Sequence, residues 1–179
     1  MRLRDSGMPD ENYWESLFDV PYILQALGID KSIRDVAELG CGYGTFTIPI
    51  VRAISSAVYT FDIDPEMVER TKVRAGGLPV IARVRDVMQY GFGIQADAVL
   101  LFNILHCDEP QRLLKHAIDA LRPGGHVLVT HWRYGETPRG PSLEIRPRPE
   151  QIVEWASGLE LEGAVIELPP WHYGLRFRG

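Results

Sequence analysis

The chain has 179 residues, 45% of them apolar and 24% charged, and 19 Lys and Arg against 24 Asp and Glu give a net charge of −5. At roughly 100–200 residues per domain, this length predicts one domain over 1–179, and the composition excludes a disordered or fibrous chain. An acidic surface repels phosphate backbones, so nucleic acid is not the expected partner.

The two cysteines, Cys41 and Cys107, cannot build a disulfide framework, and no metal-ligand spacing predicts a metal site. Residues 1–7 lack the apolar stretch of a signal peptide, and the most apolar run, 96–105, is far shorter than the ~20 residues that cross a bilayer. We therefore expect a cytoplasmic protein without a membrane partner. The sequence indicates no oligomeric state.

Apolar residues in 11–27 recur at spacings of three to five, which predicts an N-terminal helical cap over 1–34, interrupted near Pro21 and ending at Gly28. From residue 35, short apolar runs alternate with amphipathic segments. Strands are expected at 36–39, 57–61, 80–84, 98–102 and 126–130, and helices at 45–54, 65–75 and 108–121. Continuous apolar strands are typical of a parallel sheet covered on both faces, so 35–132 is predicted as a doubly wound α/β core.

The C-terminal part, 149–179, is predicted as a helix over 149–157 followed by two strands, 162–168 and 172–178. The short connection between these strands favours antiparallel pairing at the sheet edge. The segment 133–148 before them is rich in Pro, Gly and Arg and shows no periodicity. Loops of that length are often functional, and this one is the predicted substrate loop.

A glycine-rich turn, Glu38-Leu39-Gly40-Cys41-Gly42-Tyr43-Gly44, lies between the first strand of the core and its first helix. Glycines permit positive φ and let a ligand approach the backbone closely. The spacing departs from the G-x-G-x-x-G of dinucleotide-binding proteins, because Thr45 stands at its last position. This departure disfavours a nicotinamide dehydrogenase, and it favours a thioether or sulfonium ligand over a pyrophosphate.

An acidic residue, Asp62, ends the second predicted strand, 22 positions after Gly40. A carboxylate at this place can accept hydrogen bonds from both ribose hydroxyls of an adenosine. The structural alternative for Asp62 is a helix cap, but Asp64 stands immediately before Pro65 and suits that role better.

Together these residues resemble the class I S-adenosylmethionine-dependent methyltransferases. The segment 36–44 is similar to the first motif of that family, and 61–67 is similar to its second. Arg85-Asp86-Val87 resembles the end of the family's third strand, and 121–129 resembles the entry to its fifth. The resemblance implies an α/β, doubly wound, Rossmann-like sheet of seven strands with an antiparallel last strand, preceded here by the N-terminal helical segment.

The resemblance also implies S-adenosylmethionine as the cofactor. Its methionine part would be wrapped by Gly40, Cys41, Gly42 and Gly44. Glu38 would order this turn or face the ammonium group of the cofactor. Cys41 is expected to be a small packing residue rather than a reactive thiol, since nothing cationic lies near it in the sequence.

For the adenosine part, the resemblance assigns the ribose to Asp62 and one face of the adenine to Ile63. Asp86 would accept a hydrogen bond from the adenine amino group, and Val87 would cover the other face of the ring. Asn103, at the end of the fourth strand, would line the wall near the methyl group.

Two histidines, His106 and His131, follow the fourth and fifth strands, where ligands bind in open α/β sheets. Methyl transfer gains mainly from positioning and from exclusion of water. A base is needed only when the accepting atom carries a proton that must leave. Either histidine is a candidate base or substrate contact, and the alternative for each is a hydrogen-bonded structural role.

The substrate loop 133–148 holds four arginines and two glutamates, so 4 − 2 gives it a charge of +2. Prolines stiffen it, and its candidate contacts to a carboxylate or phosphate on the substrate are Arg139 and Arg146. The alternative is that these arginines pair with Glu144 and its neighbours at the surface. Trp14 is a candidate aromatic lid over the substrate, and its alternative is a place in the core.

The sequence therefore predicts an enzyme that transfers a methyl group from S-adenosylmethionine to a small-molecule acceptor, for example one that bears a carboxylate or phosphate. Methylation of a protein or RNA group is an alternative, as is a protein that binds S-adenosylmethionine or a nucleotide without turnover. The sequence indicates neither the identity of the acceptor nor its accepting atom.

Overall fold

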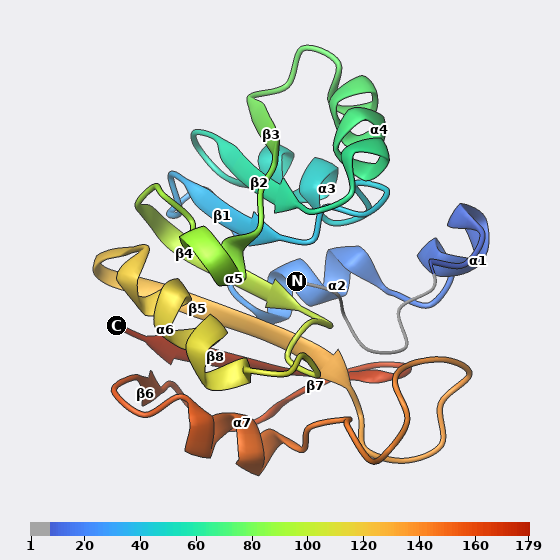
Figure 1. The fold of residues 1–179 in the computed structure, drawn as a ribbon, viewed down its shortest axis with the longest axis vertical. Helices are drawn as coiled ribbons and strands as arrows, with labels where there is room; N and C mark the ends of the chain where they lie inside the picture. Colours follow the sequence, from blue (N-terminus) through green and yellow to red (C-terminus); the bar gives the residue numbers. More distant parts are fainter. Residues whose placement is uncertain (1–7) are drawn as a thin grey trace.

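The computed structural model describes residues 8–179, so the expectation about residues 1–7 lies outside the described part. Its sheet runs in the order β3-β2-β1-β4-β5-β8-β6, with β7 also paired to β8 (Figure 1). Five strands are parallel: β1 (Val36–Leu39), β2 (Val58–Asp62), β3 (Val80–Val84), β4 (Ala96–Phe102) and β5 (Leu121–Trp132). The last strand, β8 (His172–Arg178), is antiparallel to β5, which confirms the predicted Rossmann-like topology.

The edge of the sheet beyond β8 is divided between two short strands, β6 (Glu160–Leu161) and β7 (Ile166–Leu168). Both pair antiparallel with β8. The chain leaves the edge between them at Gly163, which has a left-handed φ of +78°. The predicted strand 162–168 is therefore shorter than expected. Where the prediction of seven strands places one edge strand, the structure has the two short strands β6 and β7.

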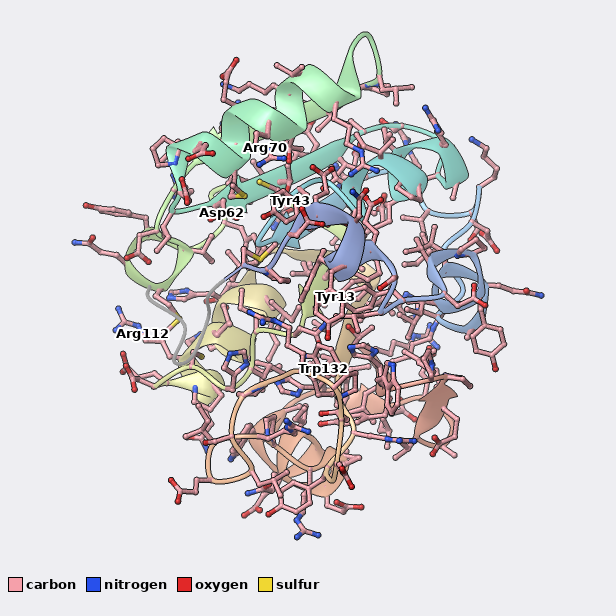
Figure 2. All side chains as sticks on the ribbon, turned by 90° about the vertical axis from the view of Figure 1, so that its right-hand side faces the viewer. Tyr13, Tyr43, Asp62, Arg70, Arg112 and Trp132 are labelled. Atoms are coloured by element: carbon pink, nitrogen blue, oxygen red, sulfur yellow. The ribbon has the colours of Figure 1, made fainter. Side chains whose placement is uncertain are left out.

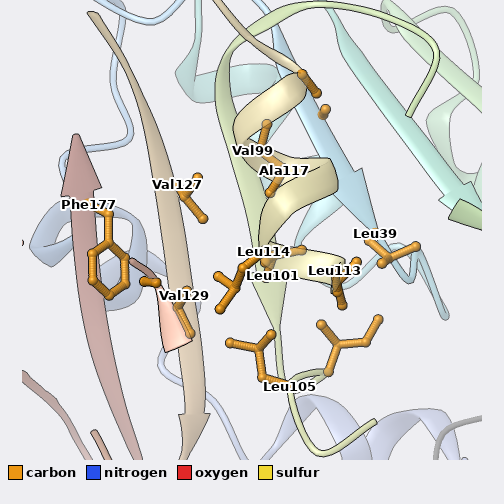
Figure 3. Close-up of a cluster of buried hydrophobic side chains, with 14 of the residues drawn as sticks. Leu39, Val99, Leu101, Leu105, Leu113, Leu114, Ala117, Val127, Val129 and Phe177 are labelled. Carbon is orange, nitrogen blue, oxygen red and sulfur yellow. The ribbon is translucent and has the colours of Figure 1, made fainter. Parts of the chain in front are cut away.

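Alternate residues of the central strands point to the two faces of the sheet and build two apolar cores. One face packs against α5 (Val87–Tyr90), α6 (Pro110–Asp119) and α7 (Pro149–Trp155). Figure 3 shows this core, in which Leu101 and Val129 of the sheet lie against Leu113 and Leu114 of α6. On the other face, Leu100 of β4 belongs to the core formed with α2 (Val20–Ala26) and α3 (Thr47–Ala53). The remaining long helix, α4 (Pro65–Ala75), packs on β2 and β3.

The N-terminal segment forms two helices, α1 (Glu11–Glu15) and α2, and the predicted interruption near Pro21 lies just before that residue. The break spans residues 16–19, and Pro21 lies in the first turn of α2, which Asp19 caps by accepting from the Tyr22 N–H at 3.1 Å. A proline there loses no hydrogen bond, because the first N–H groups of a helix have no helical partner. Within residues 8–179, no helix combines the length and apolar character needed to cross a membrane.

The carboxyl ends of the parallel strands meet at one edge of the sheet, which faces the viewer in Figure 2. Asp62 at the end of β2 and Trp132 at the end of β5 are both labelled there, above and below the blue α1 segment that carries Tyr13. Segments from both ends of the chain thus border the place where open α/β sheets bind ligands.

The core around α6 supplies a test of the packing. Leu114→Ala is expected to lower the free energy of unfolding by about 2–5 kcal/mol, because Leu114 is 1% exposed and its truncation leaves a cavity. Urea unfolding measures the difference. Leu143→Ala is the matched control, with a change within about 0.5 kcal/mol, because Leu143 is 45% exposed. Equal losses in the two variants would contradict this placement of α6.

Candidate functional site

A cavity of about 600 Å³ opens at the carboxyl edge of the sheet, within the roughly 300–1,000 Å³ usual for small-molecule and cofactor sites. The predicted site residues that line it are Trp14, Glu38, Gly40, Cys41, Gly42, Asp62, Ile63, Val87, Asn103, His106 and Arg139. Four other predicted residues, Gly44, Asp86, His131 and Arg146, are not among the described residues that line it. The fold therefore brings most of the predicted site into one space.

The glycine-rich turn and Asp62 contact each other directly. The Asp62 Oδ2 atom accepts a hydrogen bond from the Gly42 N–H at 3.2 Å, and the Cys41 Sγ lies 3.7 Å from the same oxygen. Gly40 and Gly42 have φ values of +84° and +48°, a region that favours glycine. The carboxylate thus points toward the turn rather than away from it.

A second carboxylate, that of Glu38, is buried at the end of β1 and accepts a hydrogen bond from the Thr47 hydroxyl at 2.6 Å. Burial raises the pKa of Glu38 to about 7, the nearby charge of Asp62 acts in the same direction, and the Thr47 hydrogen bond opposes them. Glu38 and Asp62 together make an acidic cradle beside the glycine turn.

Cys41 and Gly44 serve the packing of the turn. Burial raises the pKa of the Cys41 thiol, and the charge of Asp62 raises it further, so the thiol stays protonated and is a poor nucleophile. A Cβ atom at Gly44 would lie 3.4 Å from Thr71 Oγ1 and 3.6 Å from Arg74 Cδ, so Gly44 faces α4. Its predicted contact with a cofactor stays a prediction.

An apolar slot borders the acidic cradle. Ile63 is 41% exposed at the cavity, and Met67, Val87 and Met88 also line it. Asp86 caps α5 by accepting from the Gln89 N–H at 3.3 Å, so α5 presents Val87 and Met88 to the cavity. The contact of Asp86 with an adenine amino group stays a prediction.

Asn103 follows β4 in a left-handed conformation, with φ +54°, and its backbone N–H donates to the Thr130 carbonyl at 2.8 Å. Both polar atoms of its side-chain amide are buried without a hydrogen-bond partner among the described residues. Buried amides are normally paired, so this unpaired amide is an exception, and Asn103 lines the cavity wall.

The two candidate histidines form a pair. His106 Nδ1 and His131 Nε2 are 3.3 Å apart, and their rings meet edge to face. His106 lines the cavity, whereas His131 is fully buried. The pKa of His131 lies well below its usual range, because burial disfavours the charged ring and a charged His106 would repel it. His131 therefore stays neutral beside a histidine that reaches the cavity.

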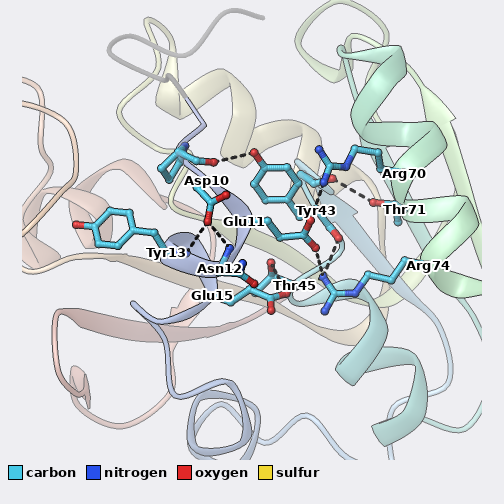
Figure 4. A network of polar contacts seen from close by, with 12 residues as sticks. Asp10, Glu11, Asn12, Tyr13, Glu15, Tyr43, Thr45, Arg70, Thr71 and Arg74 are labelled. Atoms are coloured by element: carbon cyan, nitrogen blue, oxygen red, sulfur yellow. Dashed lines mark hydrogen bonds and ion pairs between the residues drawn. The ribbon is translucent and has the colours of Figure 1, made fainter.

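Helix α1 is held over the glycine turn by the polar network in Figure 4. Glu11 and Glu15 form ion pairs with Arg74 of α4 at 3.1 and 2.6 Å, and Glu11 also pairs with Arg70 at 2.6 Å. The Tyr43 hydroxyl of the turn donates to the Pro9 carbonyl at 2.7 Å. These contacts place α1 so that its half-buried Trp14 borders the cavity.

The substrate loop is organised from within by Arg146, which is 7% exposed. Its guanidinium donates to the carbonyls of Arg133, Gly135 and Pro141, at 3.1, 2.9 and 2.6 Å. We therefore assign Arg146 to holding the loop instead of contacting a substrate. This arrangement leaves Arg139 as the arginine of the loop that lines the cavity.

Three aromatic residues of the cavity wall were not predicted from the sequence: Phe46, Phe102 and Trp132. A signal for Trp132 was present, because it stands at the carboxyl end of a predicted strand of the core, where ligands bind in open α/β sheets. No comparable signal marked Phe46, which follows the turn at the start of a helix.

The buried carboxyl group supplies a pH test. Glu38 has a folded-state pKa of about 7 against 4.5 in its ordinary state, so the folded protein binds the extra proton between these values and its stability falls as the pH rises through them. Glu38→Gln removes this pH-dependent loss. Its free energy of unfolding relative to wild type is expected to rise by on the order of 3 kcal/mol as the pH rises from 4.5 to about 8. Urea unfolding across pH measures it, with Glu160→Gln on the exposed edge as control. Parallel pH profiles for wild type and Glu38→Gln would refute the burial of this charge.

Comparison with known proteins identifies the family to which the chain belongs. Residues 36–125, half of the chain, match the family model of a methyltransferase domain. No curated protein matches the chain. The chain is similar in fold to an S-adenosylmethionine-dependent methyltransferase from Aquifex aeolicus, with a TM-score of 0.80 and 22% identity over 94% of this chain and 93% of the other.

A second similar structure is the N-methyltransferase NodS from Bradyrhizobium japonicum WM9 in complex with S-adenosylhomocysteine, with a TM-score of 0.75 and 15% identity over 96% of this chain and 93% of the other. The family match confirms the predicted resemblance and the predicted class of enzyme and cofactor. The chain belongs to the methyltransferase-domain family, the S-adenosylmethionine-dependent methyltransferases of class I.

Proposed function

We propose that this protein transfers a methyl group from S-adenosylmethionine to a small-molecule acceptor that bears a carboxylate or a phosphate. The observation that carries the proposal is one cavity in which the acidic cradle shares about 600 Å³ with His106 and Arg139. A cavity of this size supports a cofactor together with a small acceptor. The net charge of −5 speaks against nucleic acid as the acceptor, and we retain the expectation of a cytoplasmic location.

The acidic cradle suits a cofactor with a cationic end. Asp62 supplies one carboxylate and Glu38, once ionised, a second, and these charges attract an ammonium or sulfonium group and repel a pyrophosphate. A Cβ atom at Gly42 would come within 3.3 Å of Met8 Cε, so a larger residue would narrow the space above the turn. Asp62 is proposed to hold the ribose, and Glu38 the amino group.

The apolar slot of Ile63 and Val87 suits the two faces of an adenine ring. The predicted contact of Asp86 with the adenine amino group belongs to the same proposal, since Asp86 caps the helix that presents Val87. Asn103 supplies the unpaired amide beside the acceptor space.

When bound, S-adenosylmethionine supplies an electrophilic methyl carbon: the acceptor's lone pair forms the new bond to it while the carbon–sulfur bond breaks and its electron pair stays on sulfur. His106 is proposed to take the proton that an oxygen or nitrogen acceptor gives up. We assign the shared proton of the pair to His106 Nδ1, donated to His131 Nε2. This tautomer leaves the lone pair of His106 on Nε2, and neutral His131 holds the ring in place.

The ribose role of Asp62 is tested by calorimetry. Asp62→Ala is expected to weaken binding of S-adenosylmethionine at least tenfold, about 1.4 kcal/mol, because two charged hydrogen-bond acceptors are lost. Asp119→Ala removes a surface carboxylate of α6 and serves as the control, with unchanged affinity. Unchanged affinity in Asp62→Ala, with the fold intact, would refute the role.

The role of His106 as base is tested by the pH dependence of turnover. Turnover is measured as the release of S-adenosylhomocysteine in the presence of an acceptor that the wild type methylates. His106→Gln is expected to lower kcat about 100-fold or more and to abolish its rise with pH, since the neutral ring is the active form. His131→Asn acts through His106, so it should shift this rise to another pH with a smaller loss of kcat. The control is His116→Gln on α6. If neither His106→Gln nor His131→Asn changes the profile, the histidines are structural.

A further inference from the structure

Four aromatic side chains, here called the aromatic wall, line the same cavity: Trp14, Phe46, Phe102 and Trp132. Phe46 and Phe102 meet edge to face with their ring centres 5.0 Å apart. Trp14 and Phe102 are half-buried, whereas Phe46 and Trp132 are buried. An aromatic wall of this kind offers large apolar area and preferred ring-to-ring geometries, but few hydrogen bonds.

The aromatic wall is held rigid from behind. Phe18 lies 4.8 Å from Trp14 and 5.1 Å from Phe46, and it stacks on His172 at 4.6 Å. His172 in turn lies 4.2 Å from Trp132. Burial lowers the pKa of His172 to about 3, so the ring is a neutral, flat spacer in this stack. A rigid wall loses little conformational entropy when a flat ligand binds to it.

The substrate loop closes the cavity beside the aromatic wall. Gly140 has φ +122°, and a Cβ atom there would come within 2.9 Å of the Trp132 ring, so the loop backbone lies directly on the indole. Arg146 ties the loop to its own carbonyls. Arg139 immediately precedes Gly140 and lines the same cavity as the aromatic wall.

We infer that the methyl acceptor is a planar aromatic acid, with its ring on the aromatic wall, its anionic group on Arg139 and a ring hydroxyl or N–H toward His106. This inference rests on the proposed function and narrows its acceptor. The aromatic wall discriminates against sugars and other polyhydroxylated acceptors, whose hydroxyls would lose hydrogen bonds to water. Arg139 discriminates against cationic acceptors, which aromatic walls otherwise attract.

Three matched probes test the inference by calorimetry on the protein saturated with S-adenosylhomocysteine. They are a hydroxybenzoate, the saturated hydroxycyclohexane carboxylate and phenol. The hydroxybenzoate is expected to bind about tenfold more tightly than either of the others, because the saturated acid loses ring stacking and phenol loses the charge. Choline, a cationic probe, is expected not to bind.

Variants separate the two contacts. Trp14→Leu should remove the preference for the hydroxybenzoate over the saturated acid, and Phe102→Leu is a second variant of the same kind. Arg139→Gln should weaken both acids about tenfold and leave phenol unchanged. Trp171→Leu and Arg133→Gln are the controls, since the Arg133 guanidinium lies 4.9 Å from the centre of the Trp171 ring and neither residue lines the described cavity.

The outcomes distinguish a failure of the inference about the acceptor from a failure of the proposed function. If S-adenosylhomocysteine binds but the hydroxybenzoate binds no better than the saturated acid, or fails to bind, the aromatic acid is excluded while the proposed function stands. Binding of choline more tightly than the hydroxybenzoate also excludes the aromatic acid. If S-adenosylhomocysteine itself fails to bind, the proposed function falls and this inference falls with it.

Discussion

The hydrogen bond between the Asp62 carboxylate and the Gly42 N–H is the contact on which the cavity depends. It joins the end of β2 to the turn after β1, and it forms because the left-handed glycine turns its N–H toward the neighbouring strand. With Glu38 buried beside it, this contact sets the acidic character of the cradle. A cationic ligand would offset the free-energy cost that the raised pKa of Glu38 reflects.

The cavity has two chemically different ends, and they come from different parts of the fold. The acidic end is built by β1, β2 and their turns, the nucleotide-binding elements of a doubly wound sheet. The aromatic and basic end is built by α1, by Phe46 at the start of α3, by the ends of β4 and β5 and by the substrate loop. A cationic donor and an anionic acceptor would therefore each meet complementary charge, and their attraction to opposite ends would favour one orientation.

The two outer borders of the cavity are held with different strength. The ion pairs of α1 with Arg70 and Arg74 involve side chains that are about a third or more exposed, and such pairs are weak and screened by salt. The substrate loop is tied by the buried Arg146, whose hydrogen bonds to backbone carbonyls water cannot replace. The ion pairs at the α1 border, next to the glycine turn, are thus weaker than the hydrogen bonds that tie the substrate loop.

Local patterns in the amino-acid sequence were enough to predict the strands, the glycine turn and the acid after β2, because strand and helix periodicity and glycine positions act over a few residues. They predicted the break between α1 and α2 only approximately and missed the division of the edge strand, because capping and strand pairing decide where these elements end. Folding was needed to bring Trp14, Trp132 and Arg139 to one cavity, to place His131 behind His106 and to turn Arg146 into its own loop. These contacts join segments far apart in the chain or lie in a loop without periodicity, so no local pattern encodes them.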